Sequence, residues 1–323
     1  MQDGFTIGVD IGGTKIAVGL VDHSGEIQHR LQAPMISNAG ADAGLDAVRS
    51  LIGRLSQQSA RDSSIPQMIQ KIGICCPGPL DPDTGVVINP PTLPCWRDFP
   101  LAAEIHKAYG MPVKLDNDGN GAALAEALWG SGRGYRNVFY ATIGTGIGTG
   151  IVFDGRIYHG RTGAAAEGGH MSIDYRGPHC GCGKPGCIEA LASGPAIARR
   201  ARSRLSTRSD QRSLILDLVA GNPDLITSEI VGRAYAAGDA VARDLMQETI
   251  EFLSVWLSNI VDLLEPDVMI VGGGVGSMLE PFLDELSDRL PRYCVNSRCW
   301  EIPLVPARYG IDAGIVGAAA LLL

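Results

Sequence analysis

Three features are missing from this 323-residue sequence, and each absence excludes a class of protein. No apolar run approaches the roughly 20 residues that a helix needs to cross a bilayer, so no membrane-spanning segment is expected. The first residues, MQDGFTIGVD, lack the positive start and apolar run of a signal peptide, which predicts a cytoplasmic protein. An excess of positive charge is also missing. The 27 Lys and Arg residues face 35 Asp and Glu residues, and the resulting net charge of -8 disfavours nonspecific binding to nucleic acid.

The first glycine-rich turn lacks the following helix that a Rossmann or P-loop nucleotide site needs. Residues 5–10 are predicted as a strand and IGGTK as a turn, and residues 16–22 are apolar and β-branched with no helical period. A third strand is predicted at 26–33, which makes the start a meander of strands. The same order returns over 137–160, and an internal duplication explains it most simply. The alternative is two unrelated hairpins with similar turn chemistry.

The remaining segments alternate between helical and strand patterns, which predicts two α/β domains. The predicted helices cover 42–60, 119–130, most of 195–264, 278–290 and 312–323, the last packed against the first domain. The predicted strands cover 71–76, 112–116 and 267–271. We expect the smaller domain to comprise 1–117 plus 309–323 and the larger one 118–308. At 45% hydrophobic residues, each domain can bury a core.

Three glycine-rich turns, in DIGGTK, TIGTGIGTG and VGGGVG, can bring backbone N–H groups close to an anion because glycine has no Cβ. Three such turns suit a nucleotide held between two domains. The nucleotide-binding residues predicted on this basis are Asp10, Gly12, Gly13, Thr14, Lys15, Gly144, Thr145, Gly146, Gly273 and Gly274. Asp10 would hold water on a Mg²⁺ ion, or it would merely cap its turn. Lys15 would supply charge, or it would be a solvated lysine.

Phosphoryl transfer also needs a group that accepts the proton of the attacking hydroxyl. The stretch LDNDGNGAALAE offers Asp116 and Asp118 where a strand gives way to a helix. Asp118 is nearest the start of the helix. From spacing alone it is either the base or a helix N-cap.

The cysteines are crowded in GPHCGCGKPGCIEA, residues 177–190. Cys180, Cys182 and Cys187 form C-x-C-x4-C, and His170 precedes them, so three thiolates and an imidazole are available for a closed tetrahedral zinc site. Disulfides are rare in the expected compartment. Buried cysteines acting as small hydrophobes are the alternative, which fits Cys75 and Cys76 better than this loop. A metal that orders the loop would also order Glu167 and Glu189, which could then accept hydrogen bonds from sugar hydroxyls. Otherwise they are solvated glutamates.

Taken together, DIGGTK, NDGNGAALAE, TIGTGIGTG, AAEGGHM and CGCGKPGCIEA resemble the motifs of the ROK family, in order and over essentially the whole chain. The resemblance implies a two-domain actin and hexokinase-like (ribonuclease H-like) α/β fold with duplicated β-meander units and a structural zinc loop. It also implies transfer of the γ-phosphoryl group of ATP to the 6-hydroxyl of a hexose, with Mg²⁺ and structural Zn²⁺. By the same resemblance Asp118 is the base, and the sugar ligands are Gly78, Asn117, Asp118, Glu167, His170 and Glu189. His170 would bind zinc with one ring nitrogen and sugar with the other.

Within that family, CPGPLDPDTGVV and PPTLPCW are most similar to bacterial glucokinases. Thr92 stands where those enzymes usually carry Asn, which leaves the preferred hexose open, and N-acetylmannosamine kinases are the nearest competitor. The family also contains sugar-responsive repressors, but a strand that starts at Phe5 leaves no room for a preceding helix-turn-helix. A third hypothesis is a catalytically inactive sugar sensor. The presence of Asp10, Asp118 and the three glycine-rich turns argues against it. A homodimer or homotetramer is expected.

Overall fold

A computed structural model describes the chain over residues 4–60, 69–207 and 213–323. The chain folds into two compact units. Unit 1 comprises Met1–Val138, Gly150–Ala166 and Ile311–Leu323, and unit 2 comprises Phe139–Thr149 and Glu167–Gly310. Residues 118–138 and 150–166 therefore belong to unit 1, although they fall within the predicted larger domain. Functional domain boundaries at 117/118 and 308/309 stay a prediction.

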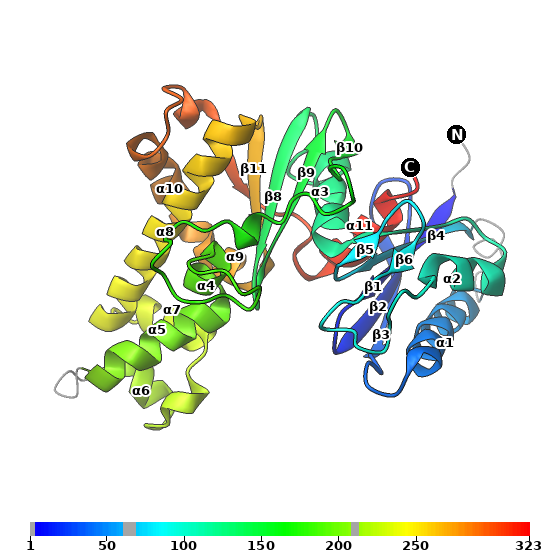
Figure 1. The fold of residues 1–323 in the computed structure, drawn as a ribbon, viewed down its shortest axis with the longest axis horizontal. Coiled ribbons are helices and arrows are strands. Elements are labelled where there is room, and N and C mark those ends of the chain that lie inside the picture. Colours follow the sequence, from blue (N-terminus) through cyan, green and yellow to red (C-terminus); the bar gives the residue numbers. More distant parts are fainter. Residues whose placement is uncertain (1–3, 61–68, 208–212) are drawn as a thin grey trace. The chain divides into compact units, whose positions relative to one another are not determined.

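A five-stranded mixed sheet in the order β3-β2-β1-β4-β7 forms the centre of unit 1 (Figure 1). Its strands are β1 (Phe5–Ile11), β2 (Lys15–Val21), β3 (Ile27–Pro34), β4 (Ile69–Cys76) and β7 (Val113–Asn117). Strand β2 is antiparallel to β1 and to β3, which confirms the predicted meander. Strand β4 is parallel to β1, and β7 is parallel to β4. Parallel neighbours need long crossovers, and helices supply them.

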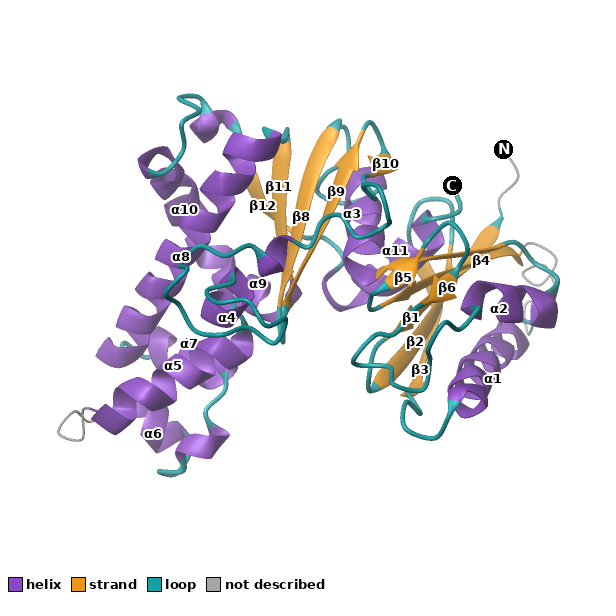
Figure 2. Ribbon diagram, in the orientation of Figure 1, coloured by secondary structure: helices purple, strands orange, loops and turns teal. Residues whose placement is uncertain are grey.

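Helices cover both faces of this sheet. They are α1 (Ala41–Ser59), α2 (Leu101–Tyr109), α3 (Asp118–Leu128) and α11 (Ala313–Ala320). A small ribbon of β5 (Leu80–Asp81) and β6 (Val86–Val87) precedes α2 (Figure 2). In α1, Leu45, Val48, Ile52 and Leu55 recur at helical spacing, and all four are buried in one core with the sheet. Each such side chain contributes about 2 kcal/mol on burial, so α1 is held mainly by its apolar face.

The opposite face carries a row of glycines that admits α11. Gly19, Gly8 and Gly73 lie directly opposite one another in β2, β1 and β4. A Cβ atom at Gly8 would lie 2.0 Å from the backbone oxygen of Ile315, and one at Gly73 would lie 1.7 Å from that of Ala318. The sheet therefore touches the backbone of α11 itself. This contact confirms the prediction that a C-terminal helix of small residues packs against the first part of the chain.

Close glycine contact also joins α11 to α3. A Cβ atom at Gly317 would lie 2.4 Å from the backbone carbonyl carbon of Gly121, so neither position accepts a side chain without displacement. The first turn of α3 is capped by Asn117, whose Oδ1 accepts a hydrogen bond from the N–H of Gly119 at 2.9 Å. Packing on α11 and capping by Asn117 together hold the start of α3 at the end of β7.

A second five-stranded sheet has the order β10-β9-β8-β11-β12 (Figure 2). Its strands are β8 (Asn137–Ile143), β9 (Ile147–Phe153), β10 (Arg156–Ile157), β11 (Val268–Gly272) and β12 (Leu304–Pro306). Each sheet thus consists of a three-strand meander followed by two later strands, as the predicted duplication requires. In the second copy the third strand has only two residues.

Seven helices are described in unit 2. They are α4 (Ile188–Ala192), α5 (Gly194–Thr207), α6 (Leu214–Leu218), α7 (Ser228–Ala236), α8 (Ala240–Leu264), α9 (Gly273–Leu279) and α10 (Leu283–Arg289). Short 3-10 turns are η2 (Gly168–His170), η3 (Pro223–Leu225), η4 (Glu280–Phe282), η5 (Leu290–Arg292), η6 (Cys299–Glu301) and, at the unit boundary, η7 (Gly310–Asp312). The buried Trp256 of α8 donates its indole N–H to the oxygen of Gly168 at 3.0 Å, which ties η2 to the core. Over the described ranges, no helix combines the length and hydropathy that a bilayer span requires.

Two predicted elements are wrong around the third glycine-rich segment. The segment 272–276 is not a turn, because β11 ends at Gly272 and α9 begins at Gly273. Gly273 has φ +85°, and a Cβ there would lie 2.5 Å from the oxygen of Ile143, so glycine permits a sharp strand-to-helix junction. The predicted helix 278–290 is interrupted by η4, where Pro281 removes a backbone donor. The predicted helical region 195–264 is observed as separate helices, and its residues 208–212 lie outside the described part.

Candidate active site

Acidic side chains converge at the carboxyl edge of the parallel strands in unit 1. Asp10 of β1 lies opposite Cys75 of β4, which lies opposite Asp116 of β7. Asp118 follows two residues later as the first residue of α3. Because parallel strands end at one edge of a sheet, residues distant in sequence meet there. Desolvation and these three carboxylates raise the pKa of Cys75 well above its ordinary value, so this buried thiol stays neutral.

The structure distinguishes the two candidate bases, Asp116 and Asp118. Asp116 is buried and its carboxylate is fully engaged. Oδ1 accepts from the N–H of Asn117 at 2.7 Å and from the amide of Asn120 at 2.9 Å, and Oδ2 contacts Nε2 of His159 at 2.6 Å. Asp118 is in contact with solvent, although the protein around its carboxylate still lowers its hydration. Its Oδ1 accepts from the N–H of Gly119 at 2.9 Å, and its own N–H is the second backbone donor to the carboxylate. In the described part of the chain no side chain donates a hydrogen bond to Asp118, so its carboxylate can accept a proton.

The carboxyl groups of Asp118 and Asp10 both have raised pKa values. Desolvation raises the pKa of Asp118, and its backbone hydrogen bonds only partly oppose the shift. Desolvation, followed by the charge of Asp118, raises the pKa of Asp10 from 3.8 to about 6, against the lowering effect of Lys15 and Arg30. Carboxylates that repel one another and are poorly hydrated gain most from a cation or a transferred proton. The helical capping role belongs to Asn117, so N-capping does not account for Asp118.

The first glycine turn lies beside these carboxylates in unit 1. The N–H of Gly12 donates to the oxygen of Lys15 at 2.8 Å, which closes the turn between β1 and β2. A Cβ at Gly13 would lie 2.8 Å from the backbone oxygen of Thr92, so the loop that carries Thr92 rests against the turn. Thr14 and Lys15 are exposed. Nearby, Gly78 lies next to Asn117, whose amide nitrogen would be 3.6 Å from a Cβ at Gly78.

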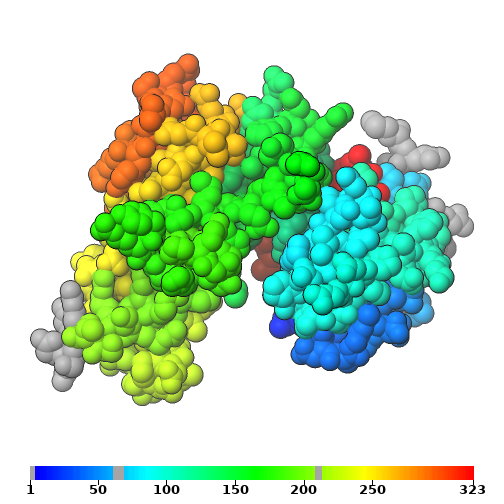
Figure 3. Space-filling view, viewed as in Figure 1, coloured from blue at the N-terminus to red at the C-terminus, as the bar shows by residue number. Residues whose placement is uncertain are grey.

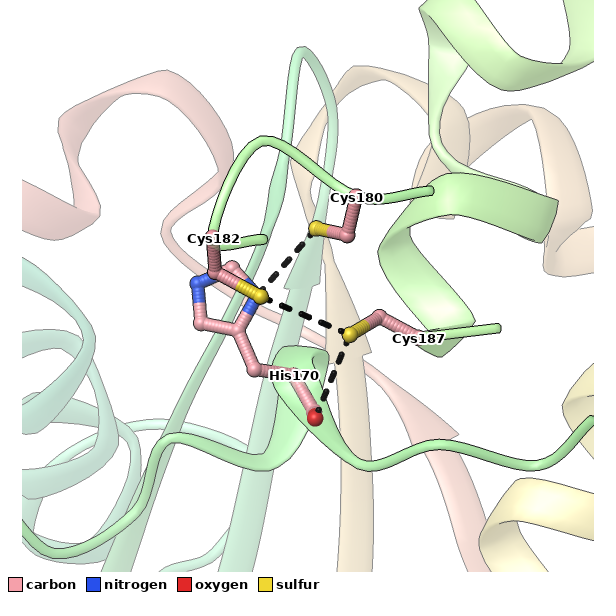
Figure 4. Close-up of side chains that lie close together, drawn as sticks. All are labelled: His170, Cys180, Cys182 and Cys187. Carbon is pink, nitrogen blue, oxygen red and sulfur yellow. Dashed lines mark hydrogen bonds between the residues drawn. The ribbon is translucent and has the colours of Figure 1, made fainter. Parts of the chain in front are cut away.

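The predicted metal ligands of unit 2 come together. His170, at the end of η2, and Cys180, Cys182 and Cys187 offer ligand atoms that all lie within 4.8 Å of one another. Figure 4 shows the three sulfur atoms and the His170 ring gathered around one point. The loop itself is on the surface, because residues 181–184 are exposed. The space-filling view draws this part of the chain in green (Figure 3).

The distances fit zinc. A tetrahedron with metal–sulfur bonds of about 2.3 Å has edges of roughly 3.7 Å. The Sγ atoms of Cys182 and Cys187 are 3.6 Å apart, and Sγ of Cys180 is 3.6 Å from Nδ1 of His170. Three soft thiolates and one imidazole form a donor set that zinc prefers in closed structural sites. All eight cysteines are free, so no disulfide competes for these sulfurs.

Glu189 joins this cluster to the second glycine turn. Its Oε1 lies 3.4 Å from Sγ of Cys180, and its Oε2 accepts from the N–H of Ile147 at 3.0 Å. A Cβ at Gly146 would lie 2.6 Å from the same Oε2, so a side chain there would displace the carboxylate from this position. Glu167 is exposed, immediately before η2. The cysteine loop and the glycine turn therefore share one carboxylate, a link that spacing did not predict.

The second and third glycine segments border a cavity within unit 2. Its volume is about 460 Å³. It is lined by Gly144, Thr145, Gly194, Pro195, Ala198, Arg202, Ile226, Thr227, Ser228, Glu229, Gly274 and Val275. The N–H of Gly194 donates to the oxygen of Gly144 at 2.8 Å, which holds the start of α5 against the turn. The cavity has the size of a small-molecule site and opens beside predicted phosphate-binding backbone.

Each unit collects a subset of the predicted site residues. Unit 1 holds Asp10, Gly12, Gly13, Thr14, Lys15, Gly78, Asn117 and Asp118, and unit 2 holds Gly144, Thr145, Gly146, Glu167, His170, Cys180, Cys182, Cys187, Glu189, Gly273 and Gly274. Sequence reasoning missed the cavity-lining residues of α5 and α7 and the contact between His159 and Asp116. No local motif marks either set, because their members meet only in the folded chain.

Comparison with known proteins agrees with this geometry. The chain is 36% identical to the glucokinase of Streptomyces coelicolor, over 98% of this chain and 97% of that one. It is 29% identical to the N-acetylmannosamine kinase of Salmonella typhi, over 98% and 97%. The crystal structure of a ROK family glucokinase from Streptomyces griseus in complex with glucose and AMPPNP superimposes with a TM-score of 0.82 at 34% identity, covering 98% of this chain and 99% of that chain. The sequence model of the ROK family matches residues 6–323, and the chain therefore belongs to the ROK family.

Proposed function

We propose that this protein is an ATP-dependent hexokinase that transfers the γ-phosphoryl group to the 6-hydroxyl of glucose. The observation that carries the proposal is the likeness, over nearly the whole chain, to a ROK family glucokinase crystallised with glucose and an ATP analogue. The motifs that carry the resemblance also occur in the family's order along the sequence. The geometry of each unit supports the role assigned to its residues.

Asp118 is the proposed general base. Its Oδ2 takes the proton of the 6-hydroxyl as the oxygen of that hydroxyl bonds to the γ-phosphorus, and ADP leaves with the electrons of the broken P–O bond. The raised pKa of Asp118 makes it a stronger base than an ordinary aspartate. Asp116 cannot replace it, because three hydrogen bonds already engage both of its oxygens.

The proposed sugar ligands are Gly78 and Asn117 in unit 1 and Glu167, His170 and Glu189 in unit 2. Carboxylate, amide and imidazole groups supply the acceptors and donors that sugar hydroxyls need. Zinc on His170, Cys180, Cys182 and Cys187 would order the loop. Because Nδ1 of His170 faces the sulfurs, its Nε2 is left for a sugar hydroxyl.

The proposed nucleotide site uses the three glycine-rich segments and the unit 2 cavity. Backbone N–H groups at residues 12–15 and 144–146 would contact the phosphates, Gly273 and Gly274 would border the nucleotide, and the cavity would hold the adenosine. Asp10 would hold Mg²⁺ through water, and the metal would neutralise charge on the phosphates. The raised pKa of Asp10 is consistent with a site that gains from a cation.

Glucose is the proposed acceptor, and N-acetylmannosamine or another hexose is the alternative. The relative of 36% identity is a glucokinase, whereas the N-acetylmannosamine kinase is 29% identical. Thr92, which packs against the first glycine turn, is the residue where the glucokinase pattern is broken. The cytoplasmic location, the dimeric or tetrameric assembly and the domain boundaries remain predictions that accompany this proposal.

The decisive variant is Asp118→Asn. Asparagine keeps the size and the hydrogen bond to Gly119 but cannot accept a proton, so the rate of ADP release with glucose is expected to fall at least about a hundredfold. Glucose binding, measured by calorimetry, is expected to change only a few-fold.

Asp42→Asn, at an exposed position in the first turn of α1, serves as the matched control and is expected to keep full activity. Turnover by Asp118→Asn at the wild-type rate would exclude Asp118 as the base. Glucose binding without any turnover by the wild type would favour the sugar-sensor alternative.

A further inference from the structure

The carboxylate of Asp116 organises the start of α3. Its Oδ1 accepts from the N–H of Asn117 and from the side chain of Asn120, at 2.7 and 2.9 Å. Asn117 in turn caps the helix through the N–H of Gly119. Asp116 is only 4% exposed, so a loss of any of these partners is not compensated by water. The direction in which Asn117 and Asp118 project therefore depends on how firmly Asp116 is held.

One hydrogen bond to this carboxylate comes from outside residues 116–120 in the described part of the chain. Nε2 of His159 lies 2.6 Å from Oδ2 of Asp116. His159 follows β10 and is 43 residues away in sequence, but both residues belong to unit 1. The backbone oxygen of His159 accepts from the N–H of Ala165 at 3.1 Å, so its own loop is also held. The side chain of His159 is 34% exposed and can exchange protons with solvent.

The charges around His159 favour its protonated form. The hydrogen bond from His159 to Asp116 raises the pKa of the imidazole, and desolvation opposes this shift. Asp83, in the turn between β5 and β6, raises it further, whereas Lys114 of β7 lowers it. A protonated imidazole gives the buried Asp116 a counter-charge as well as a donor. The neutral imidazole can still donate from Nε2, but without the charge.

We propose that His159 is a positioning residue for phosphoryl transfer, which holds Asp116 and through it the orientation of Asn117 and Asp118. This inference rests on the proposed function. It predicts that kcat decreases in steps, because a charged donor, a neutral donor and no donor hold Asp116 with decreasing strength. A residue that only stabilised the fold would not make the rate depend on the charge at this position.

The test compares His159→Leu and His159→Gln with the wild type in steady-state kinetics across pH, using glucose and ATP. Below the pKa of His159, we expect His159→Leu to lower kcat about tenfold with little change in the KM for glucose, because a misplaced base slows chemistry more than binding. His159→Gln should be intermediate, since its amide is a neutral donor. As pH rises through the pKa of His159, wild-type kcat should fall to the level of His159→Gln, which itself shows no such step.

His23→Gln, at an exposed position, is the matched control and should keep the wild-type profile. The inference would be overturned if His159→Leu had the kcat of the wild type, or if the kcat of His159→Gln fell with pH as much as that of the wild type. If His159→Leu does not fold, the profile of His159→Gln decides alone. Failure of the proposed function is a separate outcome, in which the wild type turns over no hexose. The pKa of His159 would then be measured by NMR titration in the wild type and in Asp116→Asn, and an unchanged pKa would refute the contact on which the positioning role depends.

Discussion

Asp10, Asp116 and Asp118 are chemically identical side chains that the fold places in three different environments. Asp116 accepts three hydrogen bonds, Asp118 accepts from backbone N–H groups alone in the described part of the chain, and Asp10 is poorly hydrated and repelled by Asp118. Environment rather than residue type therefore separates an anchoring carboxylate from the proposed base and from the proposed cation ligand. The neutral thiols of Cys75 and Cys76 fill the space beside them without adding charge.

Because ionised Asp10 is poorly hydrated and repelled by Asp118, we predict that Asp10→Asn stabilises the chain while abolishing phosphoryl transfer. The pKa of Asp10 rises from 3.8 to about 6 on folding, so the folded state holds a proton that the unfolded state releases. This group therefore lowers stability as pH rises from about 4 to about 6, by at most about 3 kcal/mol. Because Asp10 is partly exposed, we expect Asp10→Asn to gain about 1 kcal/mol in urea denaturation at pH 7 without Mg²⁺ or nucleotide.

The control for this prediction is Asp22→Asn. Burial raises the pKa of Asp22, but hydrogen bonds from Ser24, Glu26 and Gln28 together outweigh it and lower the pKa. Ionised Asp22 therefore stabilises the folded state above the pKa of the unfolded chain, and its replacement should lose stability at pH 7. A loss of stability in Asp10→Asn of the same sign would contradict the account of Asp10.

Local motifs made part of the site predictable at this scale. Cys180, Cys182 and Cys187 lie within eight residues, so spacing alone indicated a shared metal. Asp118 was marked by its place between a strand and a helix. Neither local sequence predicts the contact between His159 and Asp116, because the fold brings together two segments that are far apart in the chain. A lone histidine in a loop carries no information about its partner.

At the scale of elements, the meander strands, α1 and α11 followed from periodicity and from small residues. The structure of the third glycine-rich segment was not predicted correctly. Local propensity favours a turn at Gly-Gly-Gly, whereas in the structure the segment begins α9. Packing of Gly273 against the backbone of Ile143 decides between the two. The alignment of Gly8, Gly19 and Gly73 in one row was not predictable either, because it depends on the register of the three strands.

The cysteine loop is the element whose order is expected to depend on metal. Cys182→Ala removes one of four ligands, so zinc content measured by atomic absorption should fall from about one per chain to near zero. Glucose affinity should fall about tenfold or more, because Glu189 and His170 lose their fixed orientation.

The matched variant is Cys95→Ala, a partly exposed free cysteine outside the cluster, which should keep both zinc and glucose binding. An active wild-type protein that contains no zinc would contradict the metal assignment. Undiminished glucose affinity in zinc-free Cys182→Ala would show instead that the loop is ordered without metal.

For the whole molecule, the two sheets repeat one strand order, and each unit holds half of the proposed machinery. Sequence could predict this repetition because a turn glycine precedes an aspartate by ten residues in both copies, Gly12 before Asp22 and Gly144 before Asp154. It could not predict the cavity of unit 2, whose lining comes from the β8–β9 turn, α5, α7 and α9. The chain belongs to the ROK family, and the proposed function combines a proposed sugar-binding set, a proposed base and proposed nucleotide-binding turns in that one chain.

The most direct measurement is ADP release by the purified wild-type protein with ATP and Mg²⁺ over glucose, mannose, fructose, allose and N-acetylmannosamine, with the product identified by mass spectrometry and NMR. The account predicts the highest kcat/KM with glucose and a product phosphorylated at the 6-hydroxyl. Release of ADP that depends on none of these sugars, or no release at all, would contradict it.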